Sequence, residues 1–422
     1  MKKLLLVLLP LTFILFQSCT KDFGSAEVSY KKGTAVYGDI EAIRNTPLME
    51  GTRPIANAGK IFVAENLLLI GEEGAGIHIV DNTDPKNPTN LAFMNIPGNR
   101  EFYVEGTTLY AESHYDMLKI DISNKSQPRI VSRVENAFAD SEQFKNGLGE
   151  VLIKFDFEDV TETVSVDNEI HQQIWGEQAF YYYDFANQLI PPSQVPVSFA
   201  GNSSASIGSV NRIAVVENHV YVITRNSITP FEDNGQLTVF NEVYANSGME
   251  TIYPDGDKLY IGTQNSMEIF DISNPTAPSW SSSFWHATSC DPVLPCGDVA
   301  YVTLRTGDIG DCPGDENALL VLNVRNASNP TQLQEIEMES PFGMTIVGSK
   351  LYVGEGSNGL KIFNIEDKQN VTLDAWEPNI EAYDIIYHPT NPNLILIAGP
   401  VGISQYEIEG DATFSLLSTM SL

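Results

Sequence analysis

The segment Ile77-His78-Ile79-Val80-Asp81 is a short apolar run that ends in an acidic residue. Its length and its β-branched residues are typical of a β-strand, and turn residues follow it. An Asp side chain can accept hydrogen bonds from backbone N–H groups two residues further on, so this residue can hold a turn. The same pattern recurs, and in four copies a Pro lies seven residues after the acidic or amide residue: Asp81, Asp121, Asp271 and Asn323.

Three weaker copies end at Asn241, Asn364 and Glu407. A second short apolar segment precedes every copy, at 67–70, 109–110, 220–222, 259–261, 300–302, 351–353 and 394–397. The steps between the strand-ending residues are 40, 120, 30, 52, 41 and 43, so the period is near 40 apart from one long step. A four-stranded unit at this period is typical of a β-propeller blade. Because no helical period persists for 12 residues after residue 20, we predict an all-β protein, a β-propeller with seven four-stranded blades.

The long step of 120 residues marks an insertion at about 138–209. Within it, 149–160 and 179–185 have the composition of strands, and 188–208 is rich in Pro, Ser, Gly and Asn, which is typical of a loop. The insertion is either a decorating hairpin or an eighth, diverged blade. The seven clear copies favour seven blades.

The first residues have the form of an export signal. Lys2 and Lys3 precede an apolar run of 13 residues, 4–16, which is too short to cross a membrane as a helix. Ser18-Cys19 follows and resembles the bacterial lipobox, which implies cleavage after Ser18 and lipid on Cys19; the alternative is an ordinary signal with a chance Cys. We therefore expect a signal peptide at 1–18, a lipidated tether at 19–50 that can add an outer strand, and the propeller at 51–422.

Several segments together resemble one family. Gly76–Asp81 with Pro85 and Pro88, the segment 96–99, the segment 291–293 with 300–305, and the segment 159–162 are similar to the LVIVD-repeat lipoproteins of Bacteroidetes-type bacteria. The resemblance implies a β-propeller at the cell surface and says little about biochemistry. At Arg100-Glu101 the sequence departs from the family, which carries an Asp. Thr20-Lys21-Asp22 resembles the export signal of such bacteria and favours a surface-exposed outer membrane lipoprotein over a periplasmic one.

Charge and motifs exclude several function classes. The net charge of −31 argues against binding to nucleic acid and to anionic lipid through the folded body. The six His residues are widely spaced, and the sequence contains no His-Glu-x-x-His, no Gly-x-Ser-x-Gly elbow, no P-loop and no EF-hand pattern. We therefore predict no cofactor, with calcium as the alternative. The acidic loop 307–317 carries Asp308, Asp311, Asp315 and Glu316, which could supply oxygen ligands to calcium or be solvated charges.

Three cysteines remain after Cys19. If 291–295 is the inner strand of a blade, Cys290 precedes it and Cys312 lies between the second and third strands, so both lie on the same face of the disc. Cys296 lies in the turn at the opposite face, about 17 Å away and beyond the roughly 7 Å Cα limit for a disulfide. A disulfide between Cys290 and Cys312 is thus the favoured pair, and Cys290–Cys296 is the alternative if 291–295 is a loop.

Three functions remain open on these grounds. The first is a non-catalytic binding module, anchored in the membrane by its N-terminal lipid, for a protein, glycan or peptide partner. The second is a hydrolase or lyase that acts on a polysaccharide through carboxylates at the central channel. The third is a structural component of the envelope. Acidic and Tyr residues that converge at one mouth of the channel would favour the enzyme.

Overall fold

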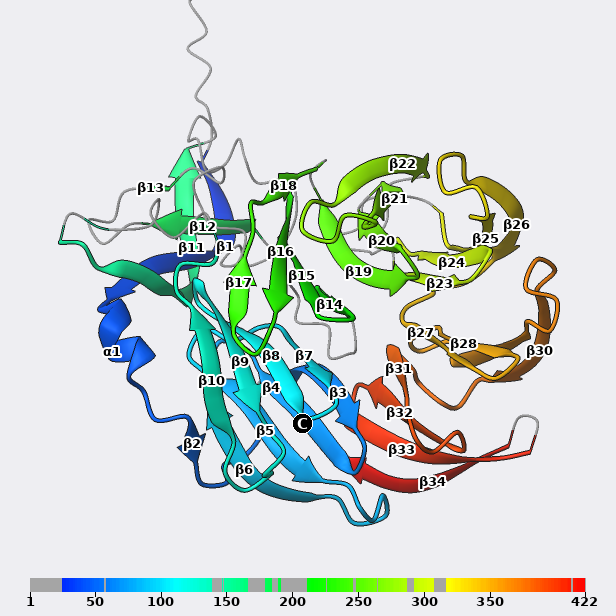
Figure 1. The fold of residues 1–422 in the computed structure, drawn as a ribbon, viewed down its shortest axis with the longest axis horizontal. Coiled ribbons are helices and arrows are strands. Elements are labelled where there is room, and N and C mark those ends of the chain that lie inside the picture. The colour runs from blue at the N-terminus through cyan, green and yellow to red at the C-terminus, as the bar shows by residue number, and fades with distance from the viewer. Residues whose placement is uncertain are drawn as a thin grey trace, which may run out of the picture.

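The computed structural model describes residues 25–56, 58–138, 146, 148–165, 179–183, 189–190, 211–224, 226–245, 248–263, 265–286, 292–306, 316–410 and 413–421. Strands dominate this part of the chain, and its one helix is the five-residue α1 (Ile40–Arg44). Seven sheets are arranged around a central axis (Figure 1). The prediction of a β-propeller with seven four-stranded blades is therefore confirmed.

The first four blades are formed in chain order. Blade 1 contains β3 (Ala58–Ala64), β4 (Leu67–Glu72), β5 (Gly76–Asp81) and β6 (Thr89–Asn95), and β2 (Met49–Glu50) pairs with β6 as an added outer strand. Blade 2 contains β7 (Phe102–Glu105), β8 (Thr108–Ser113), β9 (Asp116–Asp121) and β10 (Arg129–Val134). Blade 3 contains β14 (Ile213–Val216), β15 (His219–Ile223), β16 (Ser227–Asp233), β17 (Leu237–Val239) and β18 (Val243–Tyr244). Blade 4 contains β19 (Met249–Asp255), β20 (Lys258–Thr263), β21 (Ser266–Asp271) and β22 (Ser279–Trp285).

The last three blades follow without a long insertion. Blade 5 contains β23 (Val293–Cys296), β24 (Val299–Leu304), β25 (Ala318–Asn323) and β26 (Thr331–Glu337). Blade 6 contains β27 (Met344–Val347), β28 (Lys350–Gly354), β29 (Leu360–Asn364) and β30 (Thr372–Glu377). Blade 7 contains β31 (Asp384–Tyr387), β32 (Leu394–Gly399), β33 (Gly402–Glu409) and β34 (Thr413–Met420).

The strand-ending Asp and Asn residues hold turns, as the sequence predicts. Asp81, Asp121 and Asp271 each accept a hydrogen bond from the backbone N–H two residues further on, at 3.0, 2.9 and 2.8 Å. Asn323 and Asn364 do the same at 3.0 and 2.9 Å. Six blades also share a β-bulge at one position of the outer strand, where the unpaired residues are Leu91, Val131, Ser281, Leu333, Asp374 and Leu417. Such bulges twist an edge away from pairing with another chain.

Apolar clusters between neighbouring blades form the core, and one of them closes the ring. Ile61 and Val63 of blade 1 pack against Leu396 and Ile403 of blade 7 in a cluster of buried side chains. The buried side chains of Asn82 and Gln405 exchange two amide hydrogen bonds across the same seam, at 2.9 and 2.7 Å. Blade 1 is built from the N-terminal part of the propeller and blade 7 from the C-terminal part. These side-chain contacts, rather than a blade shared by the two chain ends, therefore close the ring.

The two faces of the disc differ in which connections they carry. In each blade the strands alternate in direction, so the fourth strand of one blade ends where the first strand of the next begins. We call this side the entry face; it also carries the turn between the second and third strands. The opposite face carries the other two turns of each blade, including those held by the strand-ending Asp and Asn residues.

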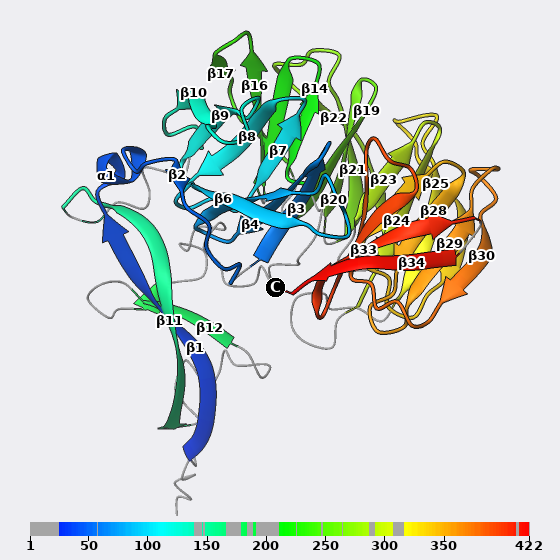
Figure 2. The ribbon, with the colours of Figure 1, turned by 90° about the horizontal axis from the view of Figure 1, so that it is seen from below.

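The insertion forms neither a simple hairpin nor an eighth blade in the part of the chain described. It joins the N-terminal segment in a separate four-stranded sheet of order β11-β1-β12-β13, which contains β1 (Ser25–Gly38), β11 (Val151–Ser165), β12 (Ala179–Tyr183) and β13 (Leu189–Ile190). We call this sheet the arm. β1 is antiparallel to β11 along its whole length and parallel to β12 over five residues. The arm reaches away from the disc (Figure 2).

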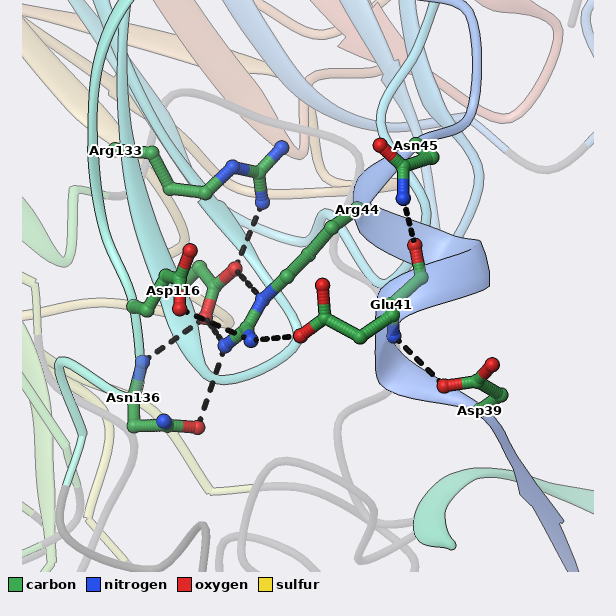
Figure 3. A network of polar contacts seen from close by, with 8 residues as sticks. Asp39, Glu41, Arg44, Asn45, Asp116, Arg133 and Asn136 are labelled. Atoms are coloured by element: carbon green, nitrogen blue, oxygen red, sulfur yellow. Dashed lines mark hydrogen bonds and ion pairs between the residues drawn. The ribbon is translucent and has the colours of Figure 1, made fainter.

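A buried network attaches the arm to blade 2 through α1. The guanidinium of Arg44 donates two hydrogen bonds to Asp116, at 2.9 and 2.8 Å, and Arg133 donates a third at 2.7 Å (Figure 3). The backbone N–H of Asn136 donates to the same carboxylate at 3.0 Å. Asp116 is 0% exposed, so all of these donors reach it away from water. We call these four residues the latch.

Candidate functional site

One position of the innermost strand is equivalent in all seven blades. It directly precedes a buried apolar residue that pairs with the second strand of the same blade, such as Ile61 opposite Ile70 and Phe102 opposite Ala111. We call this set the ring; its members from blade 1 to blade 7 are Lys60, Glu101, Arg212, Thr251, Pro292, Gly343 and Asp384. The ring lies where the innermost strands begin, at the channel mouth on the entry face.

The ring has a charged half and an uncharged half. Going around the axis, Asp384, Lys60, Glu101 and Arg212 alternate in sign. Thr251, Pro292 and Gly343 complete the circle without a charge. Because Lys60 is influenced electrostatically by Glu101, Asp384 and Arg212, the charged members from four blades lie close together.

Lys60 is at the centre of the charged half. Its side chain is buried, and its ammonium group donates to Oδ1 of Asn211 at 2.6 Å and lies 3.6 Å from Oε2 of Glu101. Burial lowers the pKa of Lys60, and the charges of Glu101 and Asp384 oppose this effect. The carboxylates therefore help this lysine to keep its proton at a buried position.

Two carboxyl groups lie side by side at the edge of the charged half. Glu112, near the end of β8, accepts a hydrogen bond from the backbone N–H of Glu101 at 3.1 Å. Burial raises the pKa of Glu112 to about 7; the charge of Arg100 opposes this effect and that of Glu101 adds to it. Asn99 holds this loop in place, because its amide donates to the carbonyl oxygens of Glu101 and Glu112 at 2.9 Å each. Glu112 can therefore exchange a proton near neutral pH.

The uncharged half contains a small pocket with an empty volume of about 240 Å³. Its lining is mostly apolar, with one carboxylate and one phenol: Tyr253, Pro292, Val293, Leu294, Gly343, Met344 and Asp384. A Cβ atom at Gly343 would collide with the carboxylate of Asp384, so a glycine is needed for this close approach. Burial raises the pKa of Tyr253, and the charge of Asp384 adds to this effect, so the phenol keeps its proton. The pocket has room for about one water molecule, so a ligand group could contact its walls but not enter it.

Comparison with known proteins supports the repeat. The family model described as "LVIVD repeat" matches residues 111–136 and 253–285. The chain thus contains LVIVD repeats. A comparison with curated proteins gave no match. Among solved structures, a functionally unknown protein from Desulfotomaculum acetoxidans is 12% identical with a TM-score of 0.51, over 86% of this chain and 96% of that one. A protein from Lactobacillus plantarum is also 12% identical with a TM-score of 0.50, over 86% and 95%. These likenesses show the fold alone.

The two LVIVD matches fall on blades 2 and 4 and include parts of the candidate site. The match at 111–136 covers Glu112, Asp116 and the strand-ending Asp121. The match at 253–285 begins at Tyr253 and covers Asp271. Each LVIVD match therefore includes blade strands together with a residue of the candidate site, Glu112 or Tyr253. Membership in the lipoprotein family stays a prediction.

Most of the residues that the sequence singled out lie outside the described residues: Cys19, Cys290, Cys312, Asp308, Asp311 and Asp315. The lipidation, the disulfide and the calcium loop therefore stay predictions. Cys296 is a free, partly exposed cysteine at the end of β23, in the turn on the opposite face. Val293–Cys296 is a strand, as the argument for a Cys290–Cys312 bond requires.

Glu316, the one calcium candidate that is described, lines an acidic surface groove. The groove has an empty volume of about 800 Å³, and Glu335, Glu337 and Glu339 also line it. Within the described residues, no three His, Cys, Asp or Glu side chains are grouped as metal ligands. No helix in the same ranges has the length and hydropathy to cross a membrane.

Two histidines of the described blades, His78 and His114, are held by local contacts and burial. His78 is buried and its Nε2 lies 2.7 Å from Oε2 of Glu72. Burial lowers the pKa of His114 to about 4, so this side chain is uncharged at neutral pH.

Sequence analysis missed the ring, because each blade contributes one residue and no local motif connects them. Lys60 and Asp384 are more than 300 positions apart in the sequence. A usable signal does exist: aligning the seven repeats on the first buried residue of each inner strand brings the ring residues into one column. Arg100-Glu101, where the sequence differs from the family that it resembles, lies at this mouth.

Proposed function

We propose that this protein is a lipid-anchored β-propeller at the cell surface that binds a protein, glycan or peptide partner at the channel mouth without catalysing a reaction. The observation that carries the proposal is the ring: four neighbouring blades bring side chains of alternating charge to one mouth, beside a small, mostly apolar pocket. Propeller scaffolds keep their blades and vary what they present at such positions.

The two halves of the mouth suit different parts of a ligand. The charged half offers Arg212 and Glu101 as partly exposed ionic partners, and buried Lys60 lies 3.6 Å from the carboxylate of Glu101. The pocket offers mostly apolar walls that a small apolar group can contact. A polar ligand with one apolar group could contact both, since charged groups give specificity and on-rate while apolar contact slows dissociation.

The proposed location rests on the amino terminus and on charge. The apolar run before Ser18-Cys19 has signal length, and a lipobox Cys receives more than one acyl chain, which gives stable anchoring. With a net charge of −31, the body of the protein is repelled from anionic lipid and relies on this anchor to stay at the membrane.

Binding can be tested with glycan and peptide arrays probed with the unlipidated protein. Arg212→Ala removes one charge from the mouth, and we expect it to weaken any specific signal by about tenfold, the value of one charge-assisted contact. Arg325→Ala is the matched control, because its guanidinium pairs with Asp298 in an exposed position on the opposite face. Equal signals from Arg212→Ala, Arg325→Ala and the wild type would contradict binding at the mouth.

A second candidate function is hydrolysis or elimination on a polysaccharide, and Glu112 favours it. A carboxyl group with a pKa of about 7 beside a second carboxylate is the arrangement that a general acid requires. If the protein is an enzyme, Glu112→Gln abolishes turnover of a polysaccharide substrate but leaves its binding intact. If it is a binding module, the wild type and Glu112→Gln both bind the polysaccharide and neither converts it.

A further inference from the structure

The arm leaves the propeller from the same face as the channel mouth. The insertion connects the outer strand β10 to the inner strand β14, and this type of connection lies on the entry face. Asp116, which holds α1, begins β9 at the turn between the second and third strands, and this turn lies on the entry face too. Both chain segments that build the arm therefore start from the entry face, at blade 2, and the arm reaches away from the disc (Figure 2).

The arm is long and paired throughout its length. β1 contains 14 residues, which span about 45 Å at 3.3 Å per residue. Lys31 pairs with Asp159 at 2.8 Å and Tyr30 donates to Glu162 at 3.0 Å, so polar contacts accompany the backbone ladder. The distal end of the arm, Ser25, lies only six positions after Cys19.

We propose that the arm is a spacer that turns the channel mouth toward the membrane and holds it roughly 45 Å away, so that the mouth receives a protein anchored in the same membrane. The proposal rests on the proposed function, through the lipid on Cys19. The latch fixes the near end of the arm to blade 2, and the lipid fixes the far end. The space between mouth and membrane is then filled most readily by the protruding part of a membrane protein. The lipid surface itself is a poor partner because the propeller is strongly acidic.

The orientation can be measured by energy transfer from a label on the protein to an acceptor in the membrane. The lipidated protein is placed in phosphatidylcholine vesicles that carry a rhodamine-headgroup lipid. One donor is attached to native Cys296 on the opposite face. The other is attached to Asn379→Cys in a Cys296→Ser background, at an exposed turn on the entry face between β30 and β31. Cys290→Ser and Cys312→Ser are present in both proteins.

The two faces are separated by about 20 Å, the length of a six-residue strand, so we expect transfer from position 379 to exceed transfer from position 296 by at least about twofold. Equal transfer, or stronger transfer from Cys296, would overturn the orientation. Vesicle flotation with Cys19→Ser is measured in parallel. If the wild type fails to float, the lipid anchor is wrong; if it floats with equal transfer at both sites, the anchor holds and the spacer is wrong.

A shortened arm tests the distance. Residues 26–29 of β1 pair with residues 161–164 of β11, so deleting both sets keeps the register and the alternation of side chains. The mouth should move about 13 Å closer to the membrane, and transfer from position 379 should rise. Unchanged transfer would show that the arm does not set the distance.

The class of partner is tested in intact cells with a photo-crosslinking residue at position 379 or, as the control, at Asp298 on the opposite face. Position 379 should crosslink to proteins that stay in the membrane pellet after carbonate washing, whereas position 298 should not. Crosslinks from position 379 to washed-off proteins alone would overturn the assignment of a membrane-anchored partner.

Discussion

Glu112 and Asp116 are four residues apart at the turn between β8 and β9, yet their surroundings differ in the groups that meet each carboxyl. Glu112 faces the channel, where burial raises its pKa to about 7. Asp116 faces α1 and is 0% exposed. Burial would also raise the pKa of Asp116, but the hydrogen bonds from Arg44, from the backbone of Asn136 and from Arg133 outweigh it and leave the pKa lowered.

The difference shows that burial alone does not decide the role of a carboxyl group. Asp116 receives hydrogen bonds from three residues, and these bonds outweigh the effect of burial, so it is ionised and structural. Glu112 competes with Glu101 for the nearby charges of Arg100 and Arg212, so its ionised form is poorly supported. Of the two carboxyl groups in this turn, Asp116 thus holds the arm and Glu112 lies at the mouth with a raised pKa.

Removing the latch should have the largest effect. Asp116→Ala removes the fully buried carboxylate that Arg44 and Arg133 share, and the exposed carboxylates of Glu41 and Glu135 still pair with Arg44. We expect the free energy of unfolding to fall by about 3 kcal/mol, the lower end of the range for a broken buried ion pair. Urea unfolding measures this fall, and hydrogen exchange of β1 and α1 reports whether the arm is released from blade 2.

Asp298→Ala is the control for the latch. It breaks the ion pair with Arg325, in which both side chains are more than half exposed, and should cost about 0–1 kcal/mol. If Asp116→Ala costs no more than Asp298→Ala, the latch does not hold the arm.

Crowding the mouth should have an intermediate effect. In Gly343→Ala the new methyl group collides with the carboxylate of Asp384, so the carboxylate must move out of its place between the pocket and Lys60. We expect a loss of about 1–3 kcal/mol, the usual cost of overpacking, together with weaker binding at the mouth.

Gly59→Ala is the matched control for the crowded mouth. Gly59 directly precedes the ring residue of blade 1, and its Cβ would meet no atom within 4 Å. A similar loss of stability in both variants would show that the close approach of Gly343 to Asp384 is not the cause.

Local sequence signals predict the blades well, because each blade is built from short-range pairings. The strand-ending Asp81 and Asp121 bond to residues two positions away, and the next strand starts within eight residues. The period near 40 then follows from the repetition of one local unit. The outer-strand bulges are not visible in the sequence, because different residue types occupy them.

The arm and the mouth depend on contacts that no local pattern encodes. Ser25 pairs with Ser165, and Arg44 bonds to a residue 72 positions later. The insertion has strand composition, but its partner is the N-terminal segment rather than its own neighbour, so the sequence suggests a hairpin or an eighth blade and favours seven blades. Likewise the pKa of Glu112 depends on Arg212, which follows the insertion.

The smallest effect, and the sharpest contrast with the latch, should come from Glu112→Gln as a function of pH. The pKa of Glu112 is raised from 4.5 to about 7 by folding, so the folded protein binds this proton more tightly than the unfolded chain. The free energy of unfolding of the wild type should therefore fall as the pH rises from about 4.5 to 7. This contribution is absent from the Gln variant, which has no carboxyl group at position 112. The raised pKa corresponds to about 3 kcal/mol at 1.36 kcal/mol per pKa unit. Because the side chain is partly exposed, screening by water should reduce this to about 1 kcal/mol.

Asp116 should give the opposite dependence. Its pKa is lowered from 3.8, so its stabilisation is present above that value and is lost as the pH falls through the lower value in the folded protein.

The prediction for Glu112 is measured by urea unfolding of the wild type and Glu112→Gln at pH 5 and pH 8. Glu112→Gln should be close to the wild type at pH 5 and more stable by about 1 kcal/mol at pH 8, because only there does the wild type hold a poorly supported charge. A variant that is less stable than the wild type at pH 8 would mean that the ionised Glu112 is well paired, and the distinction between the two carboxyl groups of this turn would fail.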